Sequence, residues 1–282
     1  MELLSAEPVA WAAVALALGL LVGSFLNVVA YRLPRMMARE WQMQCAELSG
    51  QAIEPAPAYN LVVPGSACPS CGHAIRWYEN VPVLSWLLLR GRCSACQANI
   101  SMRYPLVEAL TGLLTLAAAW QFGFTWQAAA AFVLIWCLVA LAVIDFDTQL
   151  LPDVITLPLL WLGLLANLIG LFVDLSAAVI GAVAGYLILW GVYHVFRLLT
   201  GKEGMGQGDF KLLAALGAWL GWQMLPLIIL LSSLIGAVIG VAMITLAGHD
   251  RARPIPYGPY LALAGLVALF WGQSLLAFYL GA

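Results

Sequence analysis

The stretch Gly206-Gln207-Gly208-Asp209-Phe210-Lys211 lies where a polar loop passes into a run of apolar residues. A carboxylate beside such a run is costly unless it has a role, so Asp209 is a candidate functional residue. A second carboxylate, Asp145, ends another apolar run far upstream. Long apolar runs with isolated carboxylates at their ends are typical of membrane proteins, and the remainder of the chain supports this class.

Apolar runs of this kind recur along the whole chain. Of its 282 residues, 63% are hydrophobic and 9% are charged, whereas soluble domains carry about 25% charged residues. A helix needs about 20 apolar residues to cross a bilayer. We therefore predict an all-α polytopic membrane protein with about eight transmembrane helices, the sixth of them short. The expected helices span roughly residues 9–30, 105–122, 127–146, 154–173, 176–197, 210–223, 225–247 and 258–280.

Positive charge indicates the orientation of these helices, because short loops rich in Lys and Arg stay on the cytoplasmic side. If residue 1 lies outside, all 12 Lys and Arg residues fall on the cytoplasmic side. The opposite topology would place all of them outside, so we reject it. Both termini are thus expected outside. The expected cytoplasmic segments are residues 31–104, 146–153, 198–209 and 248–257, the last of which contains Arg251 and Arg253.

The chain divides into three parts by composition. Residues 1–30 hold the first expected helix, residues 31–104 form the only sizeable segment outside the membrane, and residues 105–282 form a bundle of seven helices. Within the middle part, residues 36–66 have a weak pattern that favours a short helix followed by a loop. Residues 67–104 are rich in Cys, Gly, Pro and Trp, which indicates a small domain between the first two helices.

Four cysteines of this small domain form two C-x-x-C pairs, Cys68-Pro69-Ser70-Cys71 and Cys93-Ser94-Ala95-Cys96. Their separation is close to that of a four-thiolate zinc site, in which two tight turns aim four sulfurs at one ion. Cytosolic thiols stay reduced, which favours a metal, while redox disulfides or four unrelated thiols are the alternatives. A closed four-thiolate site leaves no position for a substrate, so we expect a structural zinc ion. Cys45, Cys137 and His73 are not expected to be ligands.

Topology brings Asp145 and Asp209 to the same side of the membrane. Asp145 ends the third expected helix, which runs inward, and Asp209 begins the sixth, which runs outward. Both carboxylates therefore lie near the cytoplasmic boundary at similar depth. Two carboxylates in one poorly solvated site share a proton, so one can activate water while the other protonates the peptide group. This is aspartic-protease chemistry, and Gly206 and Gly208 would let an extended substrate backbone approach it.

Each acidic residue also has a structural interpretation. Asp209 could simply cap the sixth helix. For Asp147 and Asp153 we favour structural roles, as solvated loop residues or, for Asp153, as the cap of the fourth helix after Pro152. Glu108 either benefits from the dipole of the second helix, in whose first turn it lies, or lines a polar pocket.

Two other functions fit parts of this pattern. Intramembrane carboxylates also mark ion pathways, so an ion-coupled transporter is one alternative. Against it, the acidic residues gather at one face instead of the midplane, and no inverted repeat is visible. A non-catalytic membrane scaffold with a zinc module is the other alternative, but it gives Asp209 no purpose. The pattern indicates no nucleic-acid partner.

Further motifs flank these residues in a defined order. The first is Gly23-Ser24-Phe25-Leu26-Asn27-Val28-Val29-Ala30-Tyr31-Arg32-Leu33-Pro34, and Arg103-Tyr104-Pro105-Leu106-Val107-Glu108 follows the two cysteine pairs. Asp145 begins a D-x6-P-D pattern, residues 206–209 read G-x-G-D, and Ile255-Pro256-Tyr257-Gly258-Pro259-Tyr260 comes last. Together, over nearly the whole chain, these motifs resemble those of the bacterial type IV prepilin peptidases, which are membrane aspartic proteases of the G-x-G-D type.

The resemblance implies a bifunctional, multi-pass enzyme of the bacterial inner membrane. It would cut the leader peptides of type IV prepilins or type II secretion pseudopilins at the cytoplasmic face, with Asp145 and Asp209 as the catalytic residues. It would then methylate the new N-terminal residue, with S-adenosylmethionine as the methyl donor. Methyl transfer is expected in residues 31–104, although no glycine-rich cofactor motif is present there. The implied partners are prepilins, pseudopilins and membrane lipid.

Overall fold

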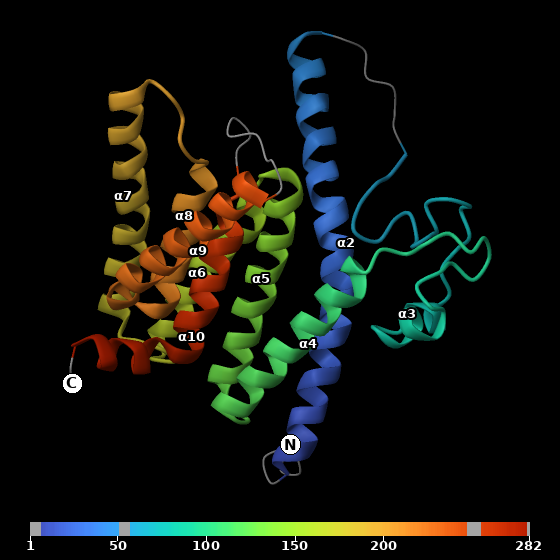
Figure 1. The fold of residues 1–282 in the computed structure, drawn as a ribbon, viewed down its shortest axis with the longest axis horizontal. Helices are drawn as coiled ribbons and strands as arrows, with labels where there is room; N and C mark the ends of the chain where they lie inside the picture. The colour runs from blue at the N-terminus through green and yellow to red at the C-terminus, as the bar shows by residue number, and fades with distance from the viewer. Residues whose placement is uncertain (1–6, 51–56, 247–254, 281–282) are drawn as a thin grey trace. The chain divides into compact units, whose positions relative to one another are not determined.

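The computed structural model describes residues 7–50, 57–246 and 255–280. The chain forms two compact units, Met1–Phe124 and Thr125–Ala282, whose helices are labelled in Figure 1. Among the described residues, all regular structure is helical except for two isolated β-bridges. This confirms the all-α fold class. Arg251 and Arg253, which we assigned to a cytoplasmic loop, lie outside the described residues.

The first unit is built on two long helices. α2 (Pro8–Leu48) is one continuous helix of 41 residues, and α4 (Arg103–Phe122) packs along it. The expectation that the first helix ends near residue 30 is wrong, because α2 continues through Pro34 to Leu48. Residues 36–48 are rich in Met, Ala, Glu and Gln, which are strong helix formers. The short helix expected in that region is therefore the second half of α2.

Glycines let α2 and α4 approach closely. A Cβ atom on Gly19 would lie 2.7 Å from the Cβ of Thr115, and one on Gly23 would lie 2.7 Å from the Cα of Glu108. Real side chains cannot occupy such positions. The side-chain amide of Asn27 also donates to the carbonyl oxygen of Tyr104 at 3.2 Å. These contacts fix the first turns of α4 against the middle of α2.

A small domain of residues 57–102 connects these two helices. Its helical elements are the 3-10 helix η1 (Trp77–Asn80) and the short helix α3 (Leu84–Leu88). Each of its two cysteine pairs lies in a loop closed by one β-bridge, Ala67 with Ala74 for the first and Arg92 with Asn99 for the second. The domain is thus held mainly by tight turns.

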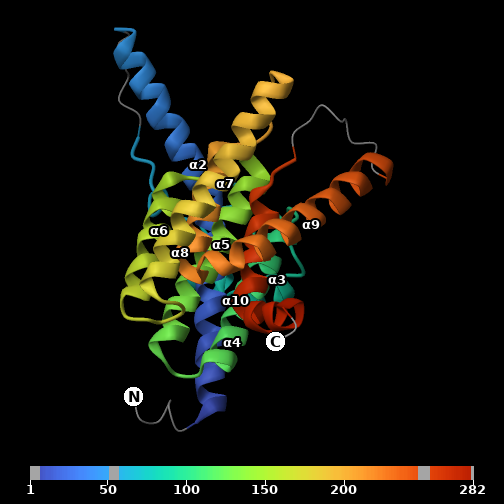
Figure 2. The same ribbon diagram turned by 90° about the vertical axis from the view of Figure 1, so that its left-hand side faces the viewer.

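The second unit is a helical bundle around α8 (Figure 2). It consists of α5 (Trp126–Thr148), α6 (Asp153–Leu168), α7 (Leu175–Thr200), α8 (Gln207–Leu220), the 3-10 helix η2 (Trp222–Met224), α9 (Leu225–Leu246) and α10 (Gly258–Leu280). α8 contacts α6, α7 and α10. From Asp209 to Leu220, every residue of α8 except Lys211 is buried. A helix without a polar face is typical of a bundle core.

The position of α8 is fixed by close backbone contact with α7. A Cβ atom on Gly181 would meet the carbonyl group of Gly217, and one on Gly185 would lie 2.6 Å from the carbonyl oxygen of Leu213. Gly181 and Gly217 face each other, since a Cβ on Gly217 would likewise meet the carbonyl group of Gly181. Such small residues allow two membrane helices to pack at short distance.

Asn167 holds the other end of α8. Its side-chain nitrogen donates to the carbonyl oxygens of Ala218 and Trp219 at 2.8 and 3.0 Å. Its side-chain oxygen accepts from the backbone N–H groups of Phe172 and Val173 at 3.0 and 3.1 Å. With 2% of its surface exposed, this one amide satisfies four backbone groups, two of them buried and two half-buried.

Each of the eight expected apolar runs overlaps one of the helices α2 and α4 to α10, but α6 ends at Leu168 and α8 at Leu220, before the expected ends at residues 173 and 223. In the part of the chain that the structure describes, six helices are long and apolar enough to cross a membrane. α6 has 16 residues and α8 has 14, fewer than the roughly 20 that a span requires. The structure supports a multi-pass membrane protein, and a total of eight crossings stays a prediction.

Candidate functional site

Asp145 lies in the last turn of α5 and is 4% exposed. Its carboxylate oxygen Oδ2 accepts a hydrogen bond of 2.9 Å from the backbone N–H of Gly258, the first residue of α10. Because a helix N-terminus carries partial positive charge, α10 offers Asp145 both a donor and a favourable field. A Cβ atom on Gly258 would lie only 2.6 Å from the same oxygen. This contact therefore requires glycine.

Asp209 lies in the first turn of α8 and is 6% exposed. Gly206 occupies the N-cap position of that helix, so the interpretation of Asp209 as a simple cap is wrong. The carboxylate of Asp209 lies close enough to that of Asp145 for the two to interact electrostatically. The fold of the second unit thus brings together the two aspartates that the topology placed at one membrane face.

Leu151, in the loop after α5, lies beside two glycines near this pair, Gly208 and Gly258. A Cβ atom on Gly208 would lie 2.7 Å from the Cβ of Leu151, and one on Gly258 would lie 3.1 Å from its Cδ2. Gly208 therefore has a packing role at the start of α8. Gly206 differs, since the nearest atom to an added Cβ is a carboxylate oxygen of Asp209 at 3.8 Å. Gly206 is exposed, so a side chain there would make only an ordinary contact with this carboxylate.

The two neighbouring acidic residues have other surroundings. Asp147 is exposed. Asp153 is the first residue of α6, with Pro152 in the cap position, and both of its carboxylate oxygens lie 2.7 Å from Nζ of Lys211. Asp153 therefore forms an ion pair between the starts of α6 and α8 instead of the expected cap.

Glu108 is a buried hydrogen-bond acceptor inside the first unit. It is 8% exposed, and its Oε2 accepts a hydrogen bond of 2.8 Å from the backbone N–H of Val83. The side chain of Ser24 is a second hydrogen-bond partner. Glu108 thus joins α4 to α2 and to the small domain, which favours the polar-pocket interpretation. Val83 has a φ of 61°, an unusual conformation for a β-branched residue.

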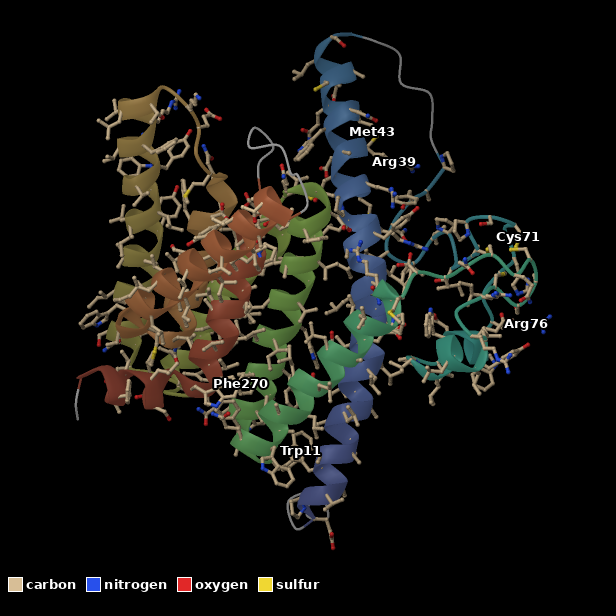
Figure 3. All side chains as sticks on the ribbon, in the orientation of Figure 1. Trp11, Arg39, Met43, Cys71, Arg76 and Phe270 are labelled. Carbon is tan, nitrogen blue, oxygen red and sulfur yellow. The ribbon has the colours of Figure 1, made fainter. Side chains whose placement is uncertain are left out.

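The four paired cysteines form one cluster in the small domain, where Figure 3 labels Cys71. Their sulfur atoms all lie within 4.8 Å of one another, and the Sγ atoms of Cys68 and Cys96 are 3.8 Å apart. Zinc–sulfur bonds of about 2.3 Å in a tetrahedron place the sulfurs about 3.8 Å apart, whereas a disulfide needs about 2.05 Å. All six cysteines of the chain are free thiols. The cluster therefore has the geometry of a metal site.

Both cysteine pairs have the same backbone conformation. The N–H of Gly72 donates to the carbonyl oxygen of Cys68 at 2.9 Å, and the N–H of Gln97 donates to that of Cys93 at 3.0 Å. Gly72 and Gln97 also share a positive φ, of 73° and 59°. One tight turn is thus built twice, and each copy presents two sulfurs to the same point.

The groups around the cluster favour sulfur over imidazole as the ligand. Backbone N–H groups of Cys71 and Ser70 lower the pKa of the Cys68 thiol to about 6, whereas, against the lowering effect of the backbone N–H of His73, the neighbouring thiols raise the pKa of Cys71 to about 12. Cys68 is thus the more readily ionised thiol of its pair, and the thiolate is the form that binds metals. The Nε2 atom of His73 instead lies 3.3 Å from a carboxylate oxygen of Glu79. His73 is therefore a neighbour of the cluster and not one of its four ligand residues.

Two family models match the chain, one in each unit. Residues 17–122 match the bacterial peptidase A24 N-terminal domain, and residues 132–241 match the type IV leader peptidase family. A prepilin leader peptidase/N-methyltransferase of Stutzerimonas stutzeri is 59% identical over 281 residues, which are 99% of this chain and 97% of the relative. The chain belongs to this family.

Other relatives with the same name agree with this assignment. The relative from Pseudomonas aeruginosa is 58% identical over 99% of this chain and 97% of its own length. The relative from Aeromonas hydrophila is 60% identical over 93% of this chain and 91% of its own length. No solved structure matches the chain. The resemblance seen in the motifs is confirmed, and the chain is a multi-pass leader peptidase of the inner membrane with N-methyltransferase activity.

One contact of Asp145 was not predicted from the sequence. Gly258 contacts Asp145 from 113 positions further along the chain, and we had used its segment, residues 255–260, only for the resemblance. The available signal was the Gly-Pro pair at the start of an apolar run, since proline is favoured in the first turn of a helix. That signal predicts a helix start, but not the carboxylate that it contacts.

Proposed function

We propose that this leader peptidase cleaves prepilins or pseudopilins with Asp145 and Asp209 as its catalytic pair and then methylates the new N-terminus. The observation that carries the proposal is the buried pair itself. Two carboxylates, 4% and 6% exposed, interact with each other at the start of α8. An ionisable pair of this kind has a high cost in folding, and catalysis by acid and base explains why it is present.

The surroundings favour different roles for the two aspartates. Asp145 is the ionised partner, because the N–H of Gly258 and the N-terminus of α10 stabilise a negative charge on it. Asp209 holds the shared proton, because a second negative charge there would face that of Asp145. Asp145 is thus the general base and Asp209 the general acid.

The reaction then follows in two steps. Asp145 takes a proton from a water molecule whose oxygen adds to the carbonyl carbon of the scissile peptide, while Asp209 gives its proton to the carbonyl oxygen. The resulting diol collapses when one hydroxyl returns its proton to Asp209. The C–N bond breaks as the amine takes the proton held by Asp145. Both aspartates regain their initial states, and the mature protein leaves with a free amine.

The site is proposed to face the cytoplasm. All Lys and Arg residues fall on that side in the topology with both termini outside. A prepilin leader is basic and cytosolic, while the helix that follows it lies in the membrane. The scissile bond would therefore reach the pair at the inner boundary, and the exposed, side-chain-free Gly206 fits the approach of an extended backbone.

We assign methyl transfer to residues 31–104, with S-adenosylmethionine as the methyl donor. When bound, the donor supplies an electrophilic methyl group on its sulfonium sulfur, and the amine released by cleavage accepts it. Cys68, Cys71, Cys93 and Cys96 would hold one zinc ion in a structural role, since four thiolates complete its coordination shell. The ion would fix the fold of the small domain in which we place this second activity.

Two substitutions test the catalytic pair, Asp145→Asn and Asp209→Asn. Each purified variant is incubated in detergent with a prepilin-like peptide, and the products are identified by mass spectrometry. Loss of one member of a catalytic unit typically lowers the rate by at least about 10³-fold, so neither variant should cleave detectably. Asp147→Asn is the matched control, because Asp147 is exposed and lies on α5, the helix that carries Asp145. This variant should cleave the peptide at the wild-type rate.

The same spectra test the second activity separately. Offered a precleaved peptide and S-adenosylmethionine, both aspartate variants should still add one methyl group to the N-terminus. Normal cleavage by either variant would falsify the catalytic pair. Failure of wild-type protein to methylate the precleaved peptide would instead contradict the methyl-transfer assignment alone.

A further inference from the structure

The short helix α3 exposes its apolar side chains and buries a polar one. Leu84, Leu87 and Leu88 occupy one face, at positions i, i+3 and i+4, and are 58%, 57% and 83% exposed. Ser85 is 7% exposed and donates its hydroxyl to the carbonyl oxygen of Tyr78 at 3.0 Å. A helix on the surface of a soluble domain has the opposite arrangement, with its apolar stripe turned inward.

The rest of the small domain holds α3 in this orientation. The indole N–H of Trp86 donates to the carbonyl oxygen of Ile100 at 3.1 Å. Gly91 lies against the ring of the same tryptophan, since a Cβ atom there would lie 2.8 Å from it. Val83, the residue before the helix, is bonded to Glu108 of α4. Because both ends of α3 are fixed, its leucines face outward as a consequence of the fold.

The bond between Val83 and Glu108 sets the depth of α3. α4 has 20 residues, the typical length of a span, so Arg103 at its start would lie near the membrane boundary. Glu108 is five residues further, or about 7.5 Å along the helix axis. Figure 1 accordingly shows α3 level with the first half of α4 instead of beyond its start. Amphipathic interfacial helices bury their apolar faces at about this depth.

The charges and aromatic residues near α3 fit a lipid surface. Arg76, Arg90 and Arg92 are exposed. Glu79 is the only carboxylate of the small domain, and it is engaged by the backbone N–H of Arg76 at 2.9 Å. Trp77 is 83% exposed, and tryptophan is enriched where membrane meets water. The domain therefore presents exposed cations and an aromatic ring beside an apolar face, which fits anionic phospholipids.

We propose that α3 lies in the bilayer interface, with its three leucines among the acyl chains and its arginines at the phosphates of anionic lipids. A protein partner is the other occupant that an apolar face can take. Lipid is favoured because α4 is itself long and apolar enough to cross the membrane, so its Leu106 and Leu110, 60% and 51% exposed, would lie among acyl chains. The proposal depends on α2 and α4 crossing the membrane, and it does not depend on the aspartate pair.

Photocrosslinking of the full-length protein tests this placement. A benzophenone amino acid replaces Leu87, and the protein is reconstituted in vesicles of phosphatidylcholine and phosphatidylglycerol with a prepilin-like peptide present. The matched control carries the same probe at Ala95, an exposed position in the second cysteine loop. Because only Leu87 would reach the acyl chains, its yield of phospholipid adduct should exceed that at Ala95 by about tenfold or more.

The products separate the possible occupants. Phospholipid adducts at Leu87 and few at Ala95 support the interfacial placement. Equal lipid yields at the two positions would overturn it, and so would crosslinks from Leu87 to the peptide or to a second copy of the chain in place of lipid. Both probe variants should still cleave the peptide, which establishes that they are folded.

Discussion

Replacing Gly258 by alanine should impair peptide cleavage while leaving the bundle folded. The added Cβ would lie 2.6 Å from Oδ2 of Asp145 and 3.1 Å from Cδ2 of Leu151, whereas ordinary contacts begin at 3.4 Å. The carboxylate must therefore move by about 1 Å. The hydrogen bond of 2.9 Å from the N–H of Gly258 would be lost or bent in that movement.

The size of the effect follows from these distances. A hydrogen bond to a charged group contributes about 1.5–3 kcal/mol, and its loss in the transition state slows a reaction by about 10- to 150-fold. A misplacement of 1 Å at a catalytic group can also cost about 100-fold. The lost hydrogen bond and the misplaced carboxylate thus predict reductions in rate of the same order of magnitude. For Gly258→Ala we therefore expect kcat/KM for leader cleavage to fall by about 100-fold.

Cleavage of a prepilin-like peptide in detergent measures this change. Gly191→Ala in α7 is the matched control, because an added Cβ there meets nothing within 4 Å. It should cleave at the wild-type rate, and both variants should keep the wild-type apparent melting temperature. If Gly258→Ala cleaves as fast as Gly191→Ala, the carboxylate does not depend on this contact, and the reasoning is refuted. A lower melting temperature in Gly258→Ala alone would mean that its activity is lost through unfolding.

Two further substitutions test the small domain and the bundle core. Wild-type protein should bind about one zinc ion per chain in elemental analysis, and replacing both Cys68 and Cys71 by serine should abolish this binding. The control Cys45→Ser should keep the zinc ion. Equal zinc content in the wild type, the double variant and the control would exclude the cysteine cluster as the site. Asn167→Ala should lower the free energy of unfolding by about 3 kcal/mol, because it leaves two buried and two half-buried backbone groups without their partner. The control Asn99→Ala, at an exposed position, should leave the melting temperature almost unchanged. If Asn99→Ala and Asn167→Ala lose similar stability, the four hydrogen bonds of Asn167 are not the cause of the loss.

The features that the sequence predicted are those that depend on local pattern. Each apolar run is long enough to identify by itself, so all eight were found. The cysteine cluster was predictable because each C-x-x-C pair forms its turn from its own residues, with Gly72 and Gln97 in the same left-handed conformation. Only the meeting of the two turns needed the fold. Asp145 and Asp209 were paired through charge topology, which fixes depth but not contact.

The features that the sequence did not predict depend on tertiary contacts or on a weak local preference. Gly258 meets Asp145 across 113 positions, and no spacing rule connects a helix start to a carboxylate so far away. Pro34 gave a reason to expect a helix end, since proline lacks an N–H and clashes with the preceding turn. α2 continues through it nonetheless, because residues 35–48 that follow it are mostly strong helix formers.

The short central helix explains how an acidic pair persists at a membrane boundary. α8 is buried on all sides from Phe210 onward, apart from Lys211, so Asp209 borders protein and not lipid. Its depth is set by the contact of Gly217 with Gly181, because eight residues of rigid helix, or about 12 Å, separate Gly217 from Asp209. The bundle thus positions the aspartate before any substrate binds, as a catalytic group requires. Since Gly206 at the start of this helix is exposed whereas residues 212–220 are buried, we expect the substrate to approach from the loop before α8 and not through the bundle.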